Sequence, residues 1–377
     1  MIGVRNASRQ QADHPAPPER FGNTPEMRCI VKAPSVKTIP AKTPAPLRGV
    51  SLIELLIATF IGITVCGMVA GALQEMSRVS LRLQERNRAE EEARSLGEYL
   101  LSRVRLAGGL ALRPHHALAV VNSTQGPDQL LIATPRSMNM SCSIVGVQET
   151  AGSFSVDIAI ENSDGIDICC LTDAFASATV ALLSNDDDGQ AHWRYGIATN
   201  VDTTTCHLNL SDADVAPLEA SPTDASVFVG GTLLAVVLQI FSVDELTHRL
   251  ILSADGNGDG SRESTVIADR VLDLQVALGY DVPSWDWVID DTSDTNDEWL
   301  YNAPGDVLGQ DPDQRLGRAG RDDLRMAWIG VTIGVPLTHD ESLASHQLLD
   351  GPTLSLRGWL TASSEGKVAL RNLQIMR

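Results

Sequence analysis

The most constraining feature of this chain is a run of twenty residues, from Leu55 to Gln74, that contains no charged side chain. As one unbroken helix the run would be about 30 Å long, which matches the hydrocarbon core of a lipid bilayer. Glu54 stands at its start, with Leu52 and Ile53 before it. A carboxylate inside an apolar span costs roughly 2.5–3.5 kcal/mol on insertion scales, so we expect Glu54 to have a functional role.

The residues around this glutamate resemble the processing site of the type IV prepilins. Gly49 precedes Val50 and Ser51, Glu54 follows, and basic residues lie before the glycine. The resemblance implies that a membrane-bound prepilin peptidase cleaves after Gly49 and that Val50, the new N-terminus, is methylated. It also implies that the helix anchors the subunit and later packs inside a filament, where Glu54 meets the N-terminal amine of a neighbouring subunit. The alternative is an ordinary signal-anchor helix whose glutamate faces a partner.

Residues 1–49 contain eight of the eighteen prolines and few hydrophobic residues. Such a segment cannot bury enough apolar area to offset its ordering entropy, so we expect a disordered leader that is cleaved off. It has eight basic and three acidic residues. Positive charge before a span favours the cytoplasmic side, which puts the C-terminal part outside. A start at Met27 would give a shorter leader without acidic residues, and both starts stay open.

The helical pattern continues beyond the apolar run. Gly108-Gly109 then follows as a stop signal. We therefore expect one N-terminal helix over residues 50–107, of which residues 50–73 are transmembrane, and we expect its polar stretch Gln84–Glu92 to be a solvated face. The hydrophobic residues that recur at spacings of three and four are Met76, Val79, Leu83, Ala93, Leu96, Leu100 and Val104.

Residues 108–377 change to a period of two, which is typical of β-strands. Ala268–Leu278 is either a short helix or a strand, and about 270 residues suffice for one large core or for two lobes. The expected fold class is α+β, a long N-terminal membrane or filament helix followed by a β-rich, pilin-like globular domain. The expected strands are Asp128–Thr134, Ser153–Ile160, Gly165–Leu171, Thr179–Leu183, Ser226–Asp244, Arg249–Leu252, Met326–Val335, Thr353–Leu360 and Val368–Ile375.

The charge of the expected exported part is strongly acidic. The whole chain has 29 basic and 48 acidic residues; without the 8 basic and 3 acidic residues of the leader, 21 and 45 remain, a formal net charge of −24. Lys367 is the one lysine left. A nucleic-acid groove needs a basic stripe, so this composition argues against one. It suits an exported domain that repels itself and attracts cations.

Four cysteines fall in the exported part: Cys142, Cys169, Cys170 and Cys206. In an exported domain they suggest two disulfides, for which three connectivities exist. Cys169 and Cys170 are neighbours in a strand-like run, so their side chains point to opposite faces. We therefore expect each to bond a distant partner and not the other. A zinc site is the alternative, but no His–Cys spacing supports it.

The segment from Asp255 to Glu263 is the sharpest local motif outside the helix. Oxygen-bearing side chains at alternate positions, separated by glycines, are typical of a calcium loop, with Asp255, Asn257, Asp259 and Glu263 as ligands. The position of the closing bidentate glutamate of an EF-hand loop is Val266 here. The alternative is a hairpin tip, since Asp, Asn and Gly also form turns. Calcium is the one cofactor that the sequence suggests.

Three further segments resemble PilW-like minor pilins. Ser102–Gly108 is similar to the helix end of that family, Val266–Asp281 to an alternating segment after a comparable loop, and Leu356–Arg377 to its closing strand. Residues 110–225 and 284–322 match nothing that we can name. The second of these is rich in Trp and Asp, and we expect an exposed insertion, either a solvated loop or a second cation-binding region.

The chain contains none of the common catalytic signatures, such as G-x-S-x-G, H-E-x-x-H, a phosphate loop or C-x-x-C, so we do not expect an enzyme. The resemblance implies a minor pilin of the bacterial inner membrane, with its C-terminus outside, that helps initiate or cap a type IV pilus. Its partners would be the prepilin peptidase, other minor and major pilins and the inner-membrane assembly platform. The rivals are a type II secretion pseudopilin, a membrane-anchored calcium-dependent adhesin and a tethered enzyme.

Overall fold

The structure is a computed structural model. It describes residues 51–109, 112, 114–123, 126–136, 141–150, 153–158, 175, 178–184, 192–202, 205–213, 215, 224–255, 261–280, 299–301, 324–336, 348 and 359–370. The chain divides into two compact units, Met1–Met68 and Val69–Arg377. Helix α1, Leu52–Arg105, has 54 residues and contributes to both units.

In the first unit, the described residues are Ser51 and the beginning of α1. Every one of them is exposed. An 18-residue stretch of α1 has a mean hydropathy of 2.3 with none of it buried, so α1 is long and apolar enough to cross a bilayer. Within the described part of the chain, no second helix meets this criterion. The prediction of one long apolar N-terminal helix is confirmed.

In the second unit, α1 becomes buried along one face only from Ala89 onward. Its buried residues are spaced by three or four positions, as expected for one face of a helix. The helix ends at Arg105, two residues before the predicted end, because the chain turns at Gly108 and Gly109, both with positive φ. The Gly108 N–H donates to Ala133 O, which ties this turn to a strand. The buried face consists of Ala89, Ala93, Leu96, Gly97, Leu100 and Val104.

Two antiparallel sheets make up most of the other described residues of the second unit, together with the short helical segments α2 (Pro114–Ala117) and the 3₁₀ helix η4 (Ala225–Phe228). The first sheet contains β1 (Leu118–Val121), β2 (Gln129–Pro135), β3 (Ser141–Thr150), β4 (Ser153–Ile158), β5 (Thr179–Leu183), β6 (Trp193–Asp202), β7 (His207–Asp212), β8 (Thr232–Asp244), β9 (Arg249–Ala254) and β10 (Glu263–Asp269). The second sheet has the order β12-β11-β13-β14, with β11 (Val271–Tyr280), β12 (Trp299–Leu300), β13 (Leu324–Pro336) and β14 (Trp359–Ala369).

Six strands of the first sheet close on themselves in the order β8-β3-β4-β7-β6-β5. Strand β8 closes the ring, because Leu233 lies between Cys142 of β3 and Leu182 of β5. The ring is filled by its own apolar cluster, which includes these three residues together with Phe228 and Leu208. A closed ring has no unpaired edge at this point, and alternate side chains fill its interior.

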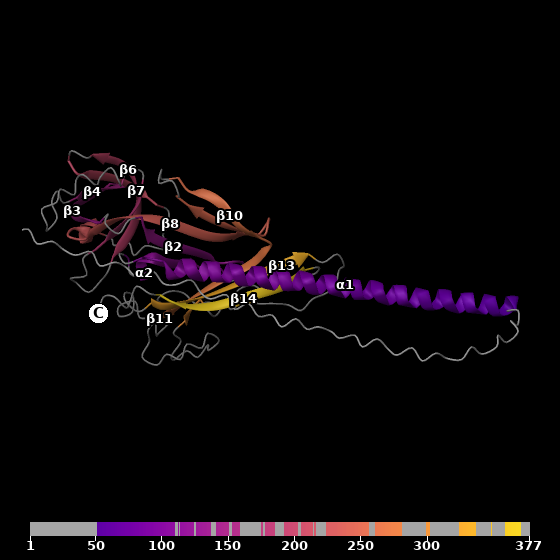
Figure 1. Ribbon diagram of the computed structural model, residues 1–377. Helices are drawn as coiled ribbons and strands as arrows, with labels where there is room; N and C mark the ends of the chain where they lie inside the picture. The colour runs from indigo at the N-terminus through magenta and orange to yellow at the C-terminus, as the bar shows by residue number, and fades with distance from the viewer. Residues whose placement is uncertain are drawn as a thin grey trace, which may run out of the picture. The chain divides into compact units, whose positions relative to one another are not determined.

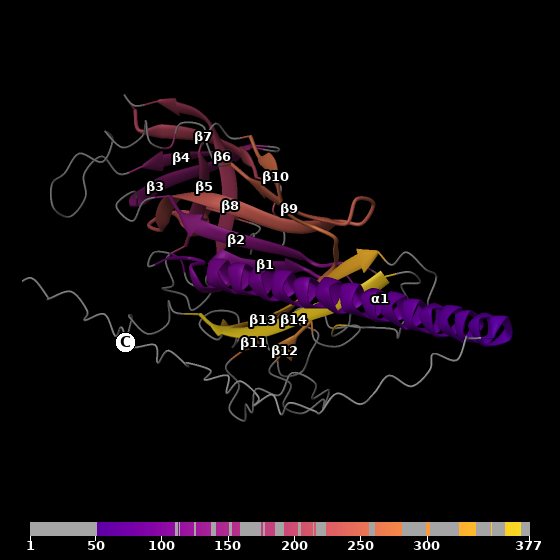
Figure 2. The same cartoon turned by 45° about the vertical axis from the view of Figure 1, so that its right-hand side comes forward.

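The second half of β8 leaves the ring and pairs with β2 and β9. This part of the first sheet and the second sheet cover α1 from two sides: in both views, the C-terminal part of α1 lies between β2 and β14 (Figures 1 and 2). Leu100 of α1, Ile132 of β2 and Ile329 of β13 belong to one cluster of buried residues. The hydrophobic face of α1 is therefore the centre of a core that both sheets share.

A buried aspartate joins the two sheets. The side chain of Asp128, next to β2, accepts hydrogen bonds from the N–H groups of Ser123 and Val276, each at 2.8 Å, and its own N–H donates to Leu274 O at 2.7 Å. Val276 and Leu274 belong to β11 of the second sheet. Because buried backbone groups need partners, Asp128 satisfies the edge of β11 where no strand of the described part pairs with it.

The α+β prediction is confirmed. The two largest apolar clusters of the described residues surround α1 and fill the ring. The ambiguous segment Ala268–Leu278 is strand, within β10 and β11. The prediction of a break between Leu360 and Val368 is wrong, since β14 runs through it. Its polar residues look like a turn in the sequence, but they pair with β13 in unbroken register. The predicted strand Gly165–Leu171 lies outside the described residues.

Candidate functional site

Glu54 lies in the first turn of α1 and is exposed. Its Oε2 accepts a hydrogen bond from the backbone N–H of Ser51 at 3.2 Å, and Leu55 N–H donates to Ser51 O at 3.2 Å. A serine followed three residues later by a glutamate that returns to the serine N–H is one half of a capping box. The negative charge also lies at the positive end of the helix dipole. Glu54 therefore stabilises the start of α1 in a single chain.

The surface around Glu54 is apolar on every side of the helix. Two hydroxyl groups in this segment donate to the helix's own carbonyls, Thr59 to Leu56 O at 2.9 Å and Thr64 to Phe60 O at 2.8 Å. Their polar atoms are thereby satisfied without water, as an apolar environment requires. The side chains that are more than half exposed include Leu52, Ile53, Leu55, Leu56, Ile57, Phe60, Ile61, Ile63, Val65, Met68 and Val69. So large an apolar surface needs lipid or protein to cover it.

The predicted cleavage site cannot be placed in this structure, because Gly49 and Val50 lie outside the described residues. Ser51 is the first residue that is described, one position after the predicted new N-terminus. An amine at Val50 would precede the capping residue directly, and Val50 and Glu54 are four positions apart. The Glu54 carboxylate can therefore have two kinds of partner: the Ser51 N–H at the start of its own helix, or the amine of a cleaved Val50.

The buried end of α1 carries an ion pair that the sequence pattern did not suggest. Glu92, in the stretch expected to be a solvated face, bonds Arg270 and also pairs with Arg88 at 2.9 Å. Arg270 is the single residue between β10 and β11 and has a φ of 62°. The expectation is therefore wrong for Glu92, which fixes α1 at the point where the chain passes from one sheet to the other. Periodicity on α1 alone gives no signal for it, since the partner is 178 residues away.

The cysteines follow the prediction only in part. Cys206 is disulfide-bonded. Cys142 is a free, buried thiol in the apolar cluster of the ring, and burial raises its pKa to about 11. The prediction of two disulfides is therefore wrong for Cys142, whose position on β3 is shielded by hydrophobic neighbours. Cys169 and Cys170 lie outside the described residues.

The predicted calcium loop joins two paired strands. Ala254 of β9 is opposite Glu263 of β10, so the residues between them form the hairpin connection. Asp255 is buried and Glu263 is exposed, whereas Asn257 and Asp259 lie outside the described residues. Within the described ranges, no three His, Cys, Asp or Glu side chains are close enough to hold a metal ion. The calcium site thus stays a prediction.

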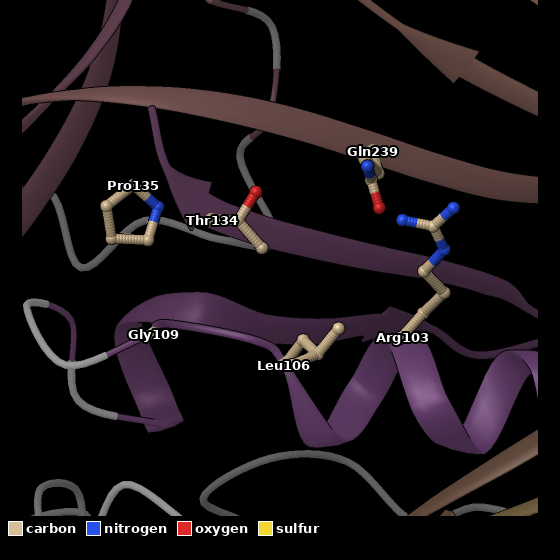
Figure 3. A pocket seen from close by; sticks show the side chains of 6 residues that line it. All are labelled: Arg103, Leu106, Gly109, Thr134, Pro135 and Gln239. Atoms are coloured by element: carbon tan, nitrogen blue, oxygen red, sulfur yellow. The ribbon is translucent and has the colours of Figure 1, made fainter. Parts of the chain in front are cut away.

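A cleft of about 270 Å³ lies beside the C-terminal end of α1 (Figure 3). Arg103 of α1 and Gln239 of β8 point toward each other across it, and the Arg103 guanidinium also lies 5.0 Å from the centre of the Tyr99 ring. These groups can donate hydrogen bonds to an acceptor, but none can act as a general base. The six lining residues are Arg103, Leu106, Gly109, Thr134, Pro135 and Gln239.

Comparison with known proteins adds a likeness at the level of structure. No protein-family model matches the chain, and no curated protein matches it. Among solved structures, a type IV-like pilin from Thermus thermophilus is similar over 78% of this chain and 98% of that chain, with 13% sequence identity and a TM-score of 0.31. A likeness at that TM-score is too weak to assign a family or to carry an inference.

Proposed function

We propose that this chain is a minor pilin of a type IV pilus, inserted in the bacterial inner membrane, cleaved after Gly49 and taking part in the initiation or tip complex of the filament. The observation that carries the proposal is the division of α1. Its first part is apolar and exposed and begins with Glu54, and its last part is the centre of the globular core. A subunit that leaves a membrane for a filament needs both parts on one helix.

The local geometry of Glu54 supports a role for its charge in assembly. In a single chain, its carboxylate has only the Ser51 N–H as a partner among the described residues. A charge in an apolar environment is tolerated chiefly when paired, and breaking a buried pair costs about 3–5 kcal/mol. A methylated amine at Val50 of a neighbouring subunit would supply the pairing charge. The partners would be other minor and major pilins, after the prepilin peptidase has acted and with the inner-membrane assembly platform.

Replacing Glu54 with glutamine tests this role. Gln at this position still accepts the Ser51 N–H bond, so the start of the helix is preserved while the charge is removed. Glu54→Gln should be inserted and cut after Gly49 like the parent, but it should not co-purify with the other pilins. Glu75→Gln is the matched control, since Glu75 is exposed on the same helix and pairs only weakly with Arg78 at 3.8 Å. Assembly of Glu54→Gln at the level of Glu75→Gln would contradict the proposal and favour an anchored adhesin.

The same N-terminal chemistry serves a type II secretion pseudopilin. The proteins that co-purify with the parent distinguish the minor pilin from the pseudopilin. Co-purification with pilins of a surface pilus supports the proposal, whereas co-purification with pseudopilins of a secretion complex assigns the chain to secretion instead.

A further inference from the structure

The turn between β8 and β9, Asp244–His248, presents one fully exposed leucine. Leu246 is 93% exposed, more than any other large apolar side chain in the part of the chain that the structure describes. Single exposed leucines are common on protein surfaces, so exposure alone assigns nothing. What sets this one apart is how the turn holds it, where the turn lies and which charges flank it.

The turn is held by its first residue. The carboxylate of Asp244 accepts hydrogen bonds from Leu246 N–H at 3.0 Å, from Thr247 N–H at 3.4 Å and from the Thr247 hydroxyl at 2.6 Å. These hydrogen bonds hold the pKa of Asp244 below its usual range. The bond from the Thr247 hydroxyl has the largest effect, and the bond from the Leu246 N–H has the next largest. Because the backbone of Leu246 is already ordered, a partner that binds it does not have to order the turn first.

The turn lies at the end of the globular domain where α1 becomes exposed. His248 O accepts a hydrogen bond from Val271 N–H at 2.9 Å, and Arg249 pairs with Asp269 at 2.9 Å. Arg270, which follows Asp269, bonds Glu92 of α1. Glu92 lies three positions after Ala89, the first buried residue of the helix. Figure 2 shows β8, β9 and β10 on one side of α1, with β2 and β1 between β8 and the helix.

The exposed segment of α1 in the second unit carries an apolar row with arginines beside it. Met76, Val79 and Leu83 are exposed and lie three and four positions apart, so they form one apolar row. Arg82 and Arg86 each follow a member of this row by three positions and therefore flank it, and Arg86 also pairs with Glu90 of its own helix at 2.8 Å. The turn, in contrast, places Leu246 next to the acidic side chains of Asp244 and Glu245.

We propose that Leu246 anchors a contact between subunits, in which the β8–β9 turn of one copy docks on the row Met76, Val79 and Leu83 of α1 in a second copy. The proposal rests on the proposed function, since it supposes that subunits meet side by side along their helices. The acidic residues of the turn then face the arginines that flank the row. A lipid surface is a poorer partner, because bacterial membranes are anionic and the leucine is flanked by two acids.

Self-association of the full chain in detergent micelles tests the contact. Sedimentation velocity of Leu246→Asp should show association at least tenfold weaker than that of the parent, because a charge replaces the apolar anchor. Val145→Asp is the matched control, since Val145 is 55% exposed on β3 of the ring and lies away from the turn in sequence. Association of Leu246→Asp equal to that of the control would overturn the proposal.

Cross-linking tests the position of the partner. In a Cys66→Ser background, a copy with Leu246→Cys should form a disulfide with a second copy that carries Val79→Cys, but not with one that carries Leu81→Cys. Leu81 is 59% exposed and Val79 46%, so Leu81 is at least as accessible, but it lies two positions on, on the opposite side of the helix. Equal cross-linking at both positions would overturn the docking geometry. The proposal would also be overturned if Leu246→Asp bound lipid vesicles more weakly than the parent but associated equally well. That result would assign the leucine to a lipid surface.

Processing of the chain distinguishes a failure of this contact from a failure of the proposed function. Leu246→Asp should still be cut after Gly49 and inserted in the membrane, so weakened association with normal processing supports this contact. Absence of processing in the parent would instead remove the proposed function.

Discussion

At the scale of single residues, Glu54 shows how one side chain carries two separable properties. Its oxygen atoms complete the start of α1 through Ser51 N–H, which glutamine can also do, whereas its charge has no partner in the described part of the chain. The sequence predicted that Glu54 is functional from the cost of a charge beside an apolar run. The hydrogen bond to Ser51 follows from the spacing of three, but its presence in the folded chain had to be observed.

Cys142 offers a test at the same scale. Burial raises its pKa to about 11, above the usual value of a thiol, so the folded protein keeps it protonated and shielded. We expect iodoacetamide at pH 8 to modify Cys142 slowly in the folded protein and rapidly after unfolding without reductant, as measured by peptide mass mapping. The pKa of Cys142 is higher in the folded protein than in the unfolded chain. The contribution of the buried thiol to the free energy of unfolding is therefore fully present below the pKa of the unfolded thiol, and it is lost as the pH rises toward 11.

Two results would contradict this account of Cys142. Rapid modification of the folded protein would show that the thiol is accessible. A thiol that stays unmodified after unfolding without reductant would show that Cys142 is disulfide-bonded and would restore the prediction of two disulfides.

At the scale of elements, the sequence predicts the helix better than the sheets. The spacing of Ala93, Leu96, Leu100 and Val104 predicts the buried face of α1, because a helix's neighbours are local in sequence. The ring of six strands has no such signal: β8 pairs with β5 and β3 across long sequence separations, and only the tertiary structure selects those partners. The polar middle of β14 likewise reads as a turn until β13 is placed beside it.

The closure of the ring can be tested at Gly231, directly before β8. A Cβ atom there would lie 2.0 Å from the carbonyl oxygen of Leu183 in β5, and a backbone atom cannot move aside easily. We expect Gly231→Ala to destabilise the protein by about 2–3 kcal/mol through overpacking, seen as a lower midpoint in thermal unfolding of the full chain in detergent.

Gly366→Ala provides the comparison for Gly231→Ala. Its Cβ would meet Cδ1 of Leu101 at 2.5 Å, the flexible end of a side chain that can adopt another rotamer. It should therefore lower the midpoint less. Equal midpoints for the two variants would mean that the seam between β5 and β8 yields as easily as a side chain, which contradicts a closed ring.

The hairpin between β9 and β10 carries the calcium prediction. If Asp255, Asn257 and Asp259 bind calcium, adding the ion should raise the melting temperature of the full chain, because a ligand bound only by the folded state stabilises it. Asp259→Ala should abolish the increase. Equal melting with calcium and with a chelator would leave the loop as a plain turn.

At the scale of the whole molecule, charge follows the division between helix and domain. Residues 50–105 contain seven basic and seven acidic residues, whereas residues 106–377 contain 14 basic and 38 acidic residues. The helix is therefore neutral overall, and the domain carries the entire net charge of −24. Like-charged domains repel, so the attraction between subunits has to come from the helices and from specific contacts with them.

The N-terminus of the protein tests the central claim most directly. Mass spectrometry of the full chain, extracted from the membranes of cells that contain a prepilin peptidase, should find methylated Val50 as the first residue. Gly49→Leu should keep its leader, whereas Gly67→Ala, where a Cβ meets nothing within 4 Å, should be cut like the parent. An intact leader on the parent protein, or an N-terminus located after the apolar run, would contradict the account.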